Sequence, residues 1–457
     1  MNTVVQTTKG KIEGIKENNG VVFKNVPYAK PPVGELRWKR PVEADPWEGI
    51  LNCTRFGNIT VQDLPTGNEP WGAMYYKEFY ADPDYLREMS EDCLNLNIWT
   101  PAEAEEGDHL PVAFWIHGGG FGGGYSSEIE FGGEAYAEKG VITVTIEYRC
   151  GGLGFLAHPW LTEADPDGIS GNYGIYDQIA ALKWVRDNIA AFGGDPDNIT
   201  VFGQSAGCMS TQVLITSPLT EGMIAKAILQ SGAQVRKHFL ATPTLAEQEE
   251  YGKRIVKITR AKDLPELMAL PAETVKAAKG QFDGEQMLKQ QSEGNDAGGL
   301  VVVPSVDGVL LKEDVGSAIR GGRIKRIPYM VGCTIDDLGT NDADRAAGVP
   351  GLILEEAKAF CETQESFGAP DTYCYLFSRD MPDEDGTSVP AFHTAEVWYS
   401  FGTLGRCWRP FTEHDFAISR EMVDAWTNFM KTGDPNGGAC EGWKPYRKEN
   451  PYVREFR

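Results

Sequence analysis

The sequence predicts an α/β fold, with a mostly parallel central sheet covered by helices on both faces. Short runs of β-branched and apolar residues recur through the middle of the chain and indicate buried strands at 112–116, 141–146, 199–202, 227–229 and 327–331. Between some of these runs the apolar residues recur at steps of three and four, the spacing of a helix. The clearest case is 176–191, with Ile179, Leu182, Val185 and Ile189. Strands that alternate with helices favour parallel pairing, so these observations together predict the fold class.

The 457 residues are expected to form a single domain, 1–457, because large α/β sheets often run as one unit with insertions. Helical patterns without strands extend over 244–280 and 352–365. Since both lie between predicted strands, we interpret approximately 233–300 and 338–371 as helical insertions that cap the sheet. Open α/β sheets bind their ligands beyond the carboxyl ends of the strands, where such insertions gather. The first hundred residues, with many Pro, Trp and Gly, are expected to wrap the sheet edge.

Charge and composition argue against two classes of partner. Asp and Glu number 66 against 43 Lys and Arg, and the formal charge of −23 disfavours binding to nucleic acid or to an anionic membrane surface. No run approaches the roughly 18 to 20 apolar residues of a membrane-spanning helix. Residues 1–20 lack the basic start and apolar run of an export signal.

The cysteines point to a reducing compartment. Nine are scattered along the chain without CxxC pairs or close histidines, which indicates reduced, packed thiols and neither a disulfide framework nor a zinc site. We therefore expect a cytoplasmic protein, unless a leader peptide was removed. No metal or cofactor is expected.

A serine lies on a predicted sharp turn between a strand and a helix. The strand 199–202 leads into 203–207, which has the pattern Gly-x-Ser-x-Gly with Ser205 at its centre. Serine in such a strained turn passes so close to its neighbours that glycine is needed two residues before and two after. The turn would also place the N–H of Ala206 at a helix N-terminus, facing developing negative charge. The strand before it and the helical run 206–215 after it favour a nucleophile over an ordinary glycine turn.

A glycine-rich loop upstream is suited to hold that negative charge. The strand 112–116 is followed by His117, three glycines, Phe121 and three further glycines. Consecutive glycines after a strand let successive N–H groups point the same way, the His-Gly-Gly-Gly pattern that supplies oxyanion donors in esterases. A flexible glycine loop is the alternative. A phosphate-binding loop is not expected, because no Gly-Lys-Ser/Thr follows.

With these motifs and others in the same order, the sequence closely resembles the type-B carboxylesterase family, the esterases and lipases related to cholinesterases. The resemblance covers nearly the whole chain and includes 26–29, 36–38, 91–97, 148–149, 154–156, 171–174, 192–196 and 432–436. It implies an α/β-hydrolase fold and hydrolysis of carboxylic esters. It also implies oxyanion roles for Gly119, Gly120 and Ala206, and a structural salt bridge between Arg37 and Glu91.

The order of the triad in α/β-hydrolases, nucleophile then acid then histidine, directs the search for the other two groups. Downstream histidines are His238, His393 and His414, and only His393 lies in a segment, 391–397, that is similar to the family's His-x-x-Glu. Its near-neutral pKa suits it to take and return the serine proton. Glu396 in the same segment is expected to be a support.

The acid is expected just after the strand 327–331. The family pattern Gly-x-x-x-Asp-Glu-Gly falls on 332–339 so that its acid, a glutamate, corresponds to Asp337. Asp336 remains the rival. Either carboxylate could fix the histidine tautomer and stabilise imidazolium.

Several positions depart from the family pattern. Gln204 stands where many relatives have glutamate, so activity on cationic choline-like esters is not expected. Thr60 stands at the position of the disulfide partner of the cysteine that matches Cys93, so that bridge is expected to be absent unless Cys53 substitutes. The short interval from Asp337 to His393 predicts a reduced helical cap. Ser231 resembles a family serine near the triad, with a simple strand-end serine as the alternative.

These features predict an esterase that acts through a serine acyl-enzyme on small-molecule esters, neutral and apolar or aromatic, as a monomer or homodimer. Two alternatives stay open: a non-catalytic cholinesterase-like binding module, and an amide or carbamate hydrolase with the same triad. Phe121, Trp160, Trp398 and Phe401 either line an apolar pocket or pack in the core.

Overall fold

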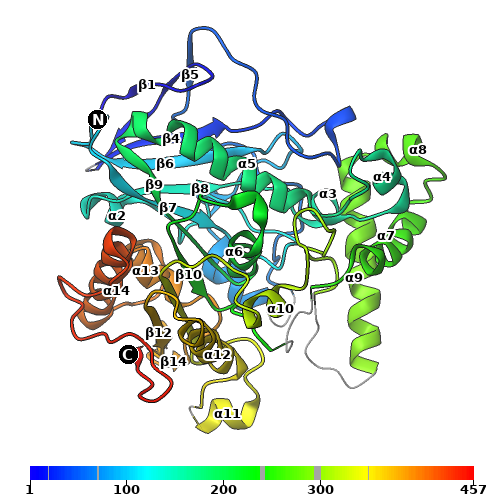
Figure 1. Ribbon diagram of the computed structural model, residues 1–457. Coiled ribbons are helices and arrows are strands. Elements are labelled where there is room, and N and C mark those ends of the chain that lie inside the picture. The colour runs from blue at the N-terminus through cyan, green and yellow to red at the C-terminus, as the bar shows by residue number, and fades with distance from the viewer. Residues whose placement is uncertain (19, 69–71, 237–241, 293–299, 348) are drawn as a thin grey trace.

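The computed structural model describes residues 1–18, 20–68, 72–236, 242–292, 300–347 and 349–457. In this part of the chain, ten strands form one large twisted sheet (Figure 1). In spatial order they are β15 (Val453–Phe456), β12 (Thr372–Phe377), β11 (Tyr329–Thr334), β10 (Lys226–Gln230), β9 (Gly194–Gln204), β7 (Leu110–Ile116), β8 (Ile142–Ile146), β6 (Asn95–Pro101), β4 (Gly20–Pro27) and β3 (Ile15–Glu17).

The strands from β15 to β8 are parallel, whereas β6, β4 and β3 join one edge through antiparallel pairing. The first hundred residues therefore build this edge, in addition to wrapping it. A small second sheet of β1 (Val4–Gln6), β2 (Lys11–Glu13) and β5 (Ile50–Asn52) comes from the same region.

Side chains that alternate along the central strands enter two separate cores, one on each face of the sheet. In β7, Phe114 and Ile116 belong to one core, while Ala113 and Trp115 belong to the other. Such strands are apolar on both faces, which explains why they were recognisable as continuous runs in the sequence. The predicted parallel sheet with helices on both faces is confirmed.

Each core is closed by its own helices. The first contains residues of α5 (Tyr173–Asn188), α6 (Ala206–Thr216), α10 (Val315–Arg320) and α12 (Leu352–Ser366). The second contains residues of α2 (Glu134–Glu138), α13 (Glu396–Ser400) and α14 (Glu413–Thr432). Phe121, Trp398 and Phe401 are fully buried in these cores, so packing explains their positions, and Trp160 is partly buried against the first.

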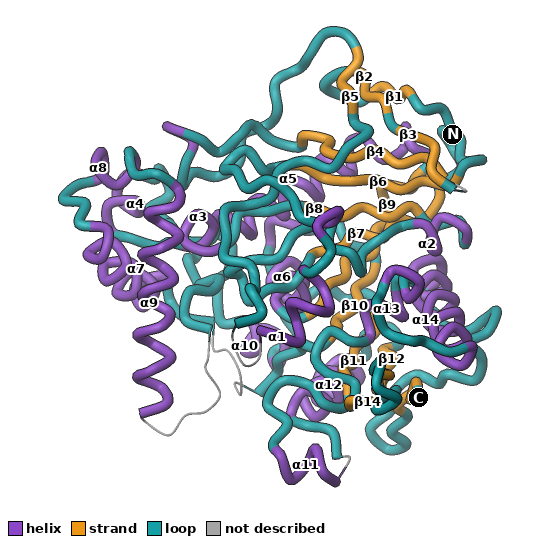
Figure 2. Tube along the Cα trace, turned by 180° about the vertical axis from the view of Figure 1, so that it is seen from behind, coloured by secondary structure: helices purple, strands orange, loops and turns teal. Residues whose placement is uncertain are grey.

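A group of helices stands to one side of the sheet, as both views show (Figures 1 and 2). It consists of α3 (Gly151–Phe155), α4 (Pro159–Ala164), α7 (Leu245–Thr259), α8 (Leu264–Met268) and α9 (Ala272–Ser292). Smaller elements are α1 (Gly72–Tyr75) with the π-helix Tyr76–Tyr80 that follows it, α11 (Asp342–Ala347), β13 (Met381–Pro382) and β14 (Ser388–Val389). Across the described ranges, every helix is too short or too polar to cross a membrane.

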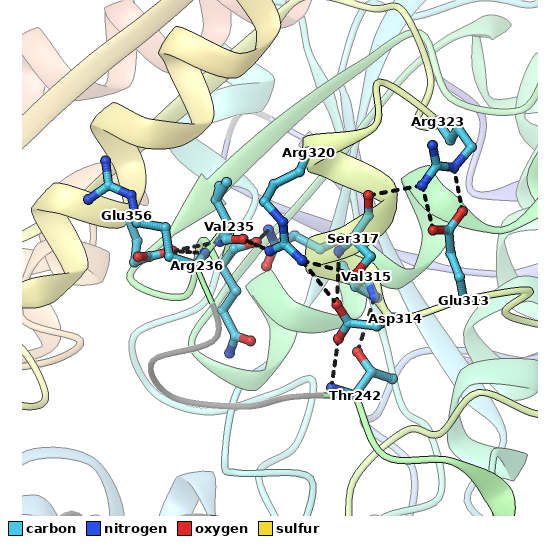
Figure 3. A network of polar contacts seen from close by, with 12 residues as sticks. Val235, Arg236, Thr242, Glu313, Asp314, Val315, Ser317, Arg320, Arg323 and Glu356 are labelled. Atoms are coloured by element: carbon cyan, nitrogen blue, oxygen red, sulfur yellow. Dashed lines mark hydrogen bonds and ion pairs between the residues drawn. The ribbon is translucent and has the colours of Figure 1, made fainter.

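A polar network fastens the chain that leaves the carboxyl end of β10 to α10 and α12 (Figure 3). The carboxylate of Glu356, in α12, accepts hydrogen bonds from the N–H groups of Val235 at 2.6 Å and Arg236 at 2.8 Å. The guanidinium of Arg320, in α10, donates to the carbonyl of Val235. Both helices thus help to fix the strand end from which the site is built.

Candidate active site

Ser205 occupies a strained turn between β9 and α6. Its φ of 57° and ψ of −124° are unusual for a residue with a side chain, and its N–H donates to the carbonyl of Gln230 at 3.0 Å. A Cβ on Gly203 would lie 2.5 Å from the carbonyl carbon of Gly207, and one on Gly207 would lie 2.0 Å from the oxygen of Ile116. Both flanking residues must therefore be glycine, as the sequence pattern predicts.

The glycine-rich loop after β7 lies directly against this turn. A Cβ on Gly118 would be only 3.2 Å from Cβ of Ser205. Gly119 and Gly120 have φ values of 99° and 61°, which glycine adopts without strain. Within the described residues, no backbone acceptor pairs with the N–H groups of Gly119, Gly120 or Ala206. Three backbone donors in the turn and the adjoining loop thus have no backbone acceptor.

His117 at the start of this loop is a structural group. It is fully buried, and burial lowers its pKa to about 4, so the ring is neutral at neutral pH. Its Nδ1 lies 2.9 Å from the carbonyl of Gly118, and its ring stacks on Tyr148 with centroids 4.3 Å apart. The Tyr148 hydroxyl donates to the His117 carbonyl at 3.0 Å. These contacts hold the entrance of the loop.

Asp337 and His393 come together from two different loops. Nδ1 of His393 lies 2.6 Å from Oδ1 of Asp337, and both side chains are buried. The same carboxylate accepts from the N–H groups of Leu338 at 2.8 Å and Thr334 at 3.2 Å. A bridge between Asp336 and Phe392 joins the two loops. The contact makes Nδ1 the donor and leaves Nε2 as an acceptor.

The pKa values of this pair fit an ionised acid and a basic histidine. Burial alone would raise the pKa of Asp337, but His393 and the hydrogen bonds from Ser231 and the Leu338 N–H together outweigh burial, and the pKa lies below its ordinary value. For His393, burial alone would lower the pKa, but the carboxyl groups of Asp337 and Glu396 together outweigh burial, and the pKa is raised. The arrangement therefore favours imidazolium when a proton arrives.

The rival acid Asp336 and the rival histidine His414 have other partners. Asp336 forms an ion pair with Arg345, whose Nε is 2.7 Å from one carboxylate oxygen and 2.9 Å from the other. His414 is exposed, and its Nε2 lies 3.1 Å from the carbonyl of Arg457. His238 falls outside the described residues.

The serine and the histidine are neighbours without being hydrogen-bonded. In the described structure no hydrogen bond joins the Ser205 hydroxyl to His393. Instead, the amide nitrogen of Gln204 lies 3.4 Å from Nδ1 and 3.3 Å from Nε2 of His393. The imidazole is thus beside the turn that carries Ser205. Catalytic hydrogen bonds in unliganded sites are often long and shorten only when substrate is bound.

Comparison with known proteins places this geometry in a family. The sequence profile of the carboxylesterase family matches residues 1–349 and 351–456. The chain belongs to this family. Among curated relatives, the fumonisin B1 esterase of Sphingopyxis macrogoltabida is 38% identical, over 97% of this chain and 85% of the relative. The para-nitrobenzyl esterase of Bacillus subtilis is 33% identical, over 98% of this chain and 93% of the relative.

Solved structures agree with this assignment. A para-nitrobenzyl esterase superposes with a TM-score of 0.82 at 31% identity, covering 100% of this chain and 96% of that one. A carboxylesterase of Geobacillus stearothermophilus superposes with a TM-score of 0.79 at 30% identity, covering 99% and 96%. The α/β-hydrolase fold is confirmed, and the protein is a carboxylic ester hydrolase.

The ion pair that the family resemblance implied is present in this carboxylesterase, whose chain departs from the family at the disulfide position. Nε of Arg37 donates to Oε1 of Glu91 at 2.6 Å, and the two form an ion pair. All nine cysteines, Cys53 and Cys93 included, are free thiols. Thr60, at the position of the missing disulfide partner, accepts instead a hydrogen bond from the N–H of Cys150 at 3.3 Å.

Behind the histidine of the carboxylesterase lies a second buried carboxyl group. Glu396 is fully buried, and one of its oxygens accepts from the Ser231 hydroxyl at 3.2 Å. Burial raises the pKa of Glu396 to about 7; Asp337 adds to this effect and His393 opposes it. Ser231 has a φ of 53°, so its place at the end of β10 is itself strained. Ser231 therefore contacts this carboxyl group and is more than a strand-end serine.

Two residues near the carboxylesterase site were not predicted from the sequence. Tyr75 donates from its hydroxyl to the carbonyl of His393 at 3.0 Å. Gln62 pairs with Gly124 at the end of the glycine-rich loop. Neither belongs to a motif with a recognisable chemistry; the position of Gln62 two residues after Thr60 is the one signal that could have drawn attention to it. Among the described residues, no group of three or more His, Cys, Asp or Glu is arranged to hold a metal ion.

Proposed function

We propose that this carboxylesterase hydrolyses small neutral esters with apolar or aromatic groups through an acyl-enzyme on Ser205. His393 is the general base, Asp337 is the acid that supports it, and the N–H groups of Gly119, Gly120 and Ala206 form the oxyanion hole. The observation that carries this proposal is the 2.6 Å contact between Asp337 and His393 beside the strained turn of Ser205.

The reaction follows from the protonation states. The Asp337 carboxylate accepts from Nδ1 of His393, which leaves Nε2 free to take the hydroxyl proton as Ser205 attacks the ester carbonyl. The carbonyl electrons move to the oxygen, and the imidazolium returns its proton to the leaving alcohol. Water, deprotonated by the same histidine, then releases the acid and restores the serine.

The oxyanion donors carry a large share of the acceleration in this proposal. Negative charge develops on the carbonyl oxygen only in the transition state, so fixed N–H groups stabilise it more than the substrate. Loss of one such donor typically costs about 10² to 10³ in rate. The unpaired N–H groups of Gly119, Gly120 and Ala206 support this role.

The substrate class is inferred from the groups around the serine. Gln204 is a neutral amide where a carboxylate would attract cations. A Cβ on Gly120 would lie 3.1 Å from Cδ2 of Leu300, a residue that is 39% exposed, so an apolar group borders the oxyanion loop. Relatives named as a fumonisin B1 esterase and a para-nitrobenzyl esterase support an ester as the substrate.

We further propose that the segments 233–300 and 338–371 form a reduced cap over the site, except for α12, which packs against β11 and β12 in the first core. Leu300 beside Gly120 supports the first segment, and the exposed Leu338 next to Asp337 supports the second.

A cytoplasmic location is supported by the nine free cysteines. The oligomeric state, proposed as monomer or homodimer, is measured directly by light scattering.

The decisive test is a panel of para-nitrophenyl esters of increasing acyl length, with the matching anilides and carbamates. We expect saturable ester hydrolysis with a preference for apolar acyl groups, and a loss of roughly 10³-fold or more in kcat in Ser205→Ala. Equal activity of Ser205→Ala would overturn the serine mechanism. Faster cleavage of anilides or carbamates would favour the amide or carbamate alternative, and no turnover of any substrate would favour the binding module.

A further inference from the structure

We propose that Gln62 is a positioning residue for the oxyanion hole, because its side-chain amide fixes the loop that carries Gly119 and Gly120. The inference rests on the proposed function, in which those two N–H groups bind the oxyanion. Gln62 is buried, with 2% of its surface exposed, and it lies in the N-terminal part of the chain. None of its hydrogen bonds in the described structure involves Ser205, Asp337 or His393.

Both sides of the Gln62 amide pair with one residue of the loop. Oε1 accepts from the N–H of Gly124 at 2.7 Å, and Nε2 donates to the carbonyl of Gly124 at 2.9 Å. The same Nε2 also lies 3.3 Å from the carbonyl of Thr60. A planar amide that holds both the N–H and the C=O of one residue fixes the orientation of that residue as well as its distance.

The loop transmits this constraint to the oxyanion donors. The carbonyl of Gly119 accepts from the N–H groups of Gly122 at 3.0 Å and Gly123 at 3.1 Å, which closes a tight turn. Gly124 follows at φ 90°, and a Cβ there would lie 2.6 Å from the carbonyl of Gly118. Because the two ends of the turn leave no room for even one added carbon, a shift of Gly124 toward Gly118 would displace Gly118 and Gly119.

Other contacts hold the rest of the loop. Its first residue, His117, is held through the Tyr148 hydroxyl, and its middle is held where the N–H of Gly151 donates to the carbonyl of Phe121 at 2.7 Å. Gln62 supplies the corresponding contact at the last residue. Since Gly124 is buried, loss of the amide would leave its N–H and C=O without partners, and the loop would relax away from this geometry.

The test compares the wild type with Gln62→Met, which keeps length and removes both hydrogen-bonding groups, and Gln62→Glu, which keeps shape and removes the donor. Kinetics on a para-nitrophenyl ester should show kcat reduced about 10- to 100-fold, with KM changed by less than about threefold, because ground-state binding does not use the oxyanion donors. A trifluoromethyl ketone tests the same point. The Ser205 oxygen adds to its carbonyl, the serine proton passes to His393, and the resulting oxyanion occupies the hole. Its affinity should fall in parallel with kcat/KM.

Asn188→Asp is the matched control. Asn188 is another buried amide that holds two backbone groups, accepting from the N–H of Thr8 at 2.7 Å and donating to the carbonyl of Trp184 at 2.8 Å, away from the site. Its variant should lose stability but keep kcat and ketone affinity per folded molecule. Circular dichroism and titration of active serines with a phosphonate correct every rate for the folded fraction. If Gln62→Met and Gln62→Glu do not fold, Gln62→Asn, which retains the amide on a shorter side chain, replaces them.

Wild-type kcat and ketone affinity in folded Gln62 variants would overturn the inference, as would an equal loss in Asn188→Asp. Neither result would affect the proposed function. The reverse also holds, since hydrolysis that survives in Ser205→Ala would overturn the proposed function itself.

Discussion

The amide nitrogen of Gln204 is nearly equally far from the two ring nitrogens of His393, at 3.4 Å and 3.3 Å. In the plane of an imidazole, the position between the two nitrogens is taken by the Cε1–H group. The amide therefore lies over the face of the ring. It brings no net charge to the histidine, whose charged neighbours are the carboxyl groups of Asp337 and Glu396.

Replacing this amide by a carboxylate should move the acid limb of the pH–rate profile. A negative group over the ring would stabilise imidazolium and raise the pKa of His393 further. The base must be neutral to accept the serine proton. When the solution is acidified, Gln204→Glu should therefore lose activity at a higher pH than the wild type does. The measurement is kcat/KM against pH, with Gln204→Met as the uncharged control. An unchanged or lower apparent pKa in Gln204→Glu would contradict this account.

Replacement of Asp337 and replacement of the adjacent Asp336 should have sharply different effects on kcat. Asp337→Asn removes the acceptor that fixes the Nδ1–H tautomer of His393, and losses of about 10⁴ in kcat are typical of that change. Asp336→Asn removes only an ion pair with the partly exposed Arg345, worth up to about 1 kcal/mol of stability. Steady-state kinetics on the two variants decides the matter: a similar loss in both, or a larger one in Asp336→Asn, would rule out Asp337.

Glu396 should make stability depend on pH. Its folded pKa of about 7 lies above the ordinary value of 4.5, so the folded state holds the proton more tightly than the unfolded state. The stability that this bound proton gives to the folded state is complete below the pKa of Glu396 in the unfolded chain. It is lost as the pH rises through about 7. A shift of this size corresponds to about 3 kcal/mol.

Glu396→Gln should remove that dependence. Urea unfolding at pH 5 and pH 8 measures the free energy of unfolding of both proteins, and the wild type should lose more stability than the variant over this interval. An identical decline in the two would show that Glu396 does not hold a proton in the folded state.

Replacement by alanine should lower the stability of the protein at Gly207 and raise it at Gly284. In Gly207→Ala the new Cβ would lie 2.0 Å from the oxygen of Ile116, so the strand and helix must separate at a cost of about 3 kcal/mol. Gly284, inside α9, has open space at its Cβ position, and Gly284→Ala should stabilise by about 0.5 to 1 kcal/mol. Thermal unfolding of the two variants tests the pair; a stable, active Gly207→Ala would contradict the geometry of the turn.

The central strands could be predicted because burial on both faces leaves unbroken apolar runs, as in β7 (Leu110–Ile116). The antiparallel edge could not. Its strands β3 and β4 lie within a region of short, mixed pieces, and their pairing with β6 depends on contacts far apart in the chain. The predicted helix over 176–191 corresponds to α5, which begins three residues earlier.

For the site, motifs with fixed spacing identified the turn of Ser205 and the glycine loop, because the chemistry requires glycine at set positions. The family pattern already favoured Asp337 over Asp336, and the structure adds that the two adjacent carboxylates face different partners, His393 and Arg345. Gln62 and Tyr75 bind backbone groups of other segments. A hydrogen bond to a backbone group leaves no pattern in the sequence of its partner, so no chemical motif marks either residue.

The most direct test of the proposed mechanism is covalent labelling with a fluorophosphonate, followed by peptide mass spectrometry. The account predicts one adduct per molecule, on the peptide that contains Ser205, with activity lost in proportion to labelling and no adduct in Ser205→Ala. Stoichiometric labelling at another residue, or labelling and hydrolysis that persist in Ser205→Ala, would contradict it.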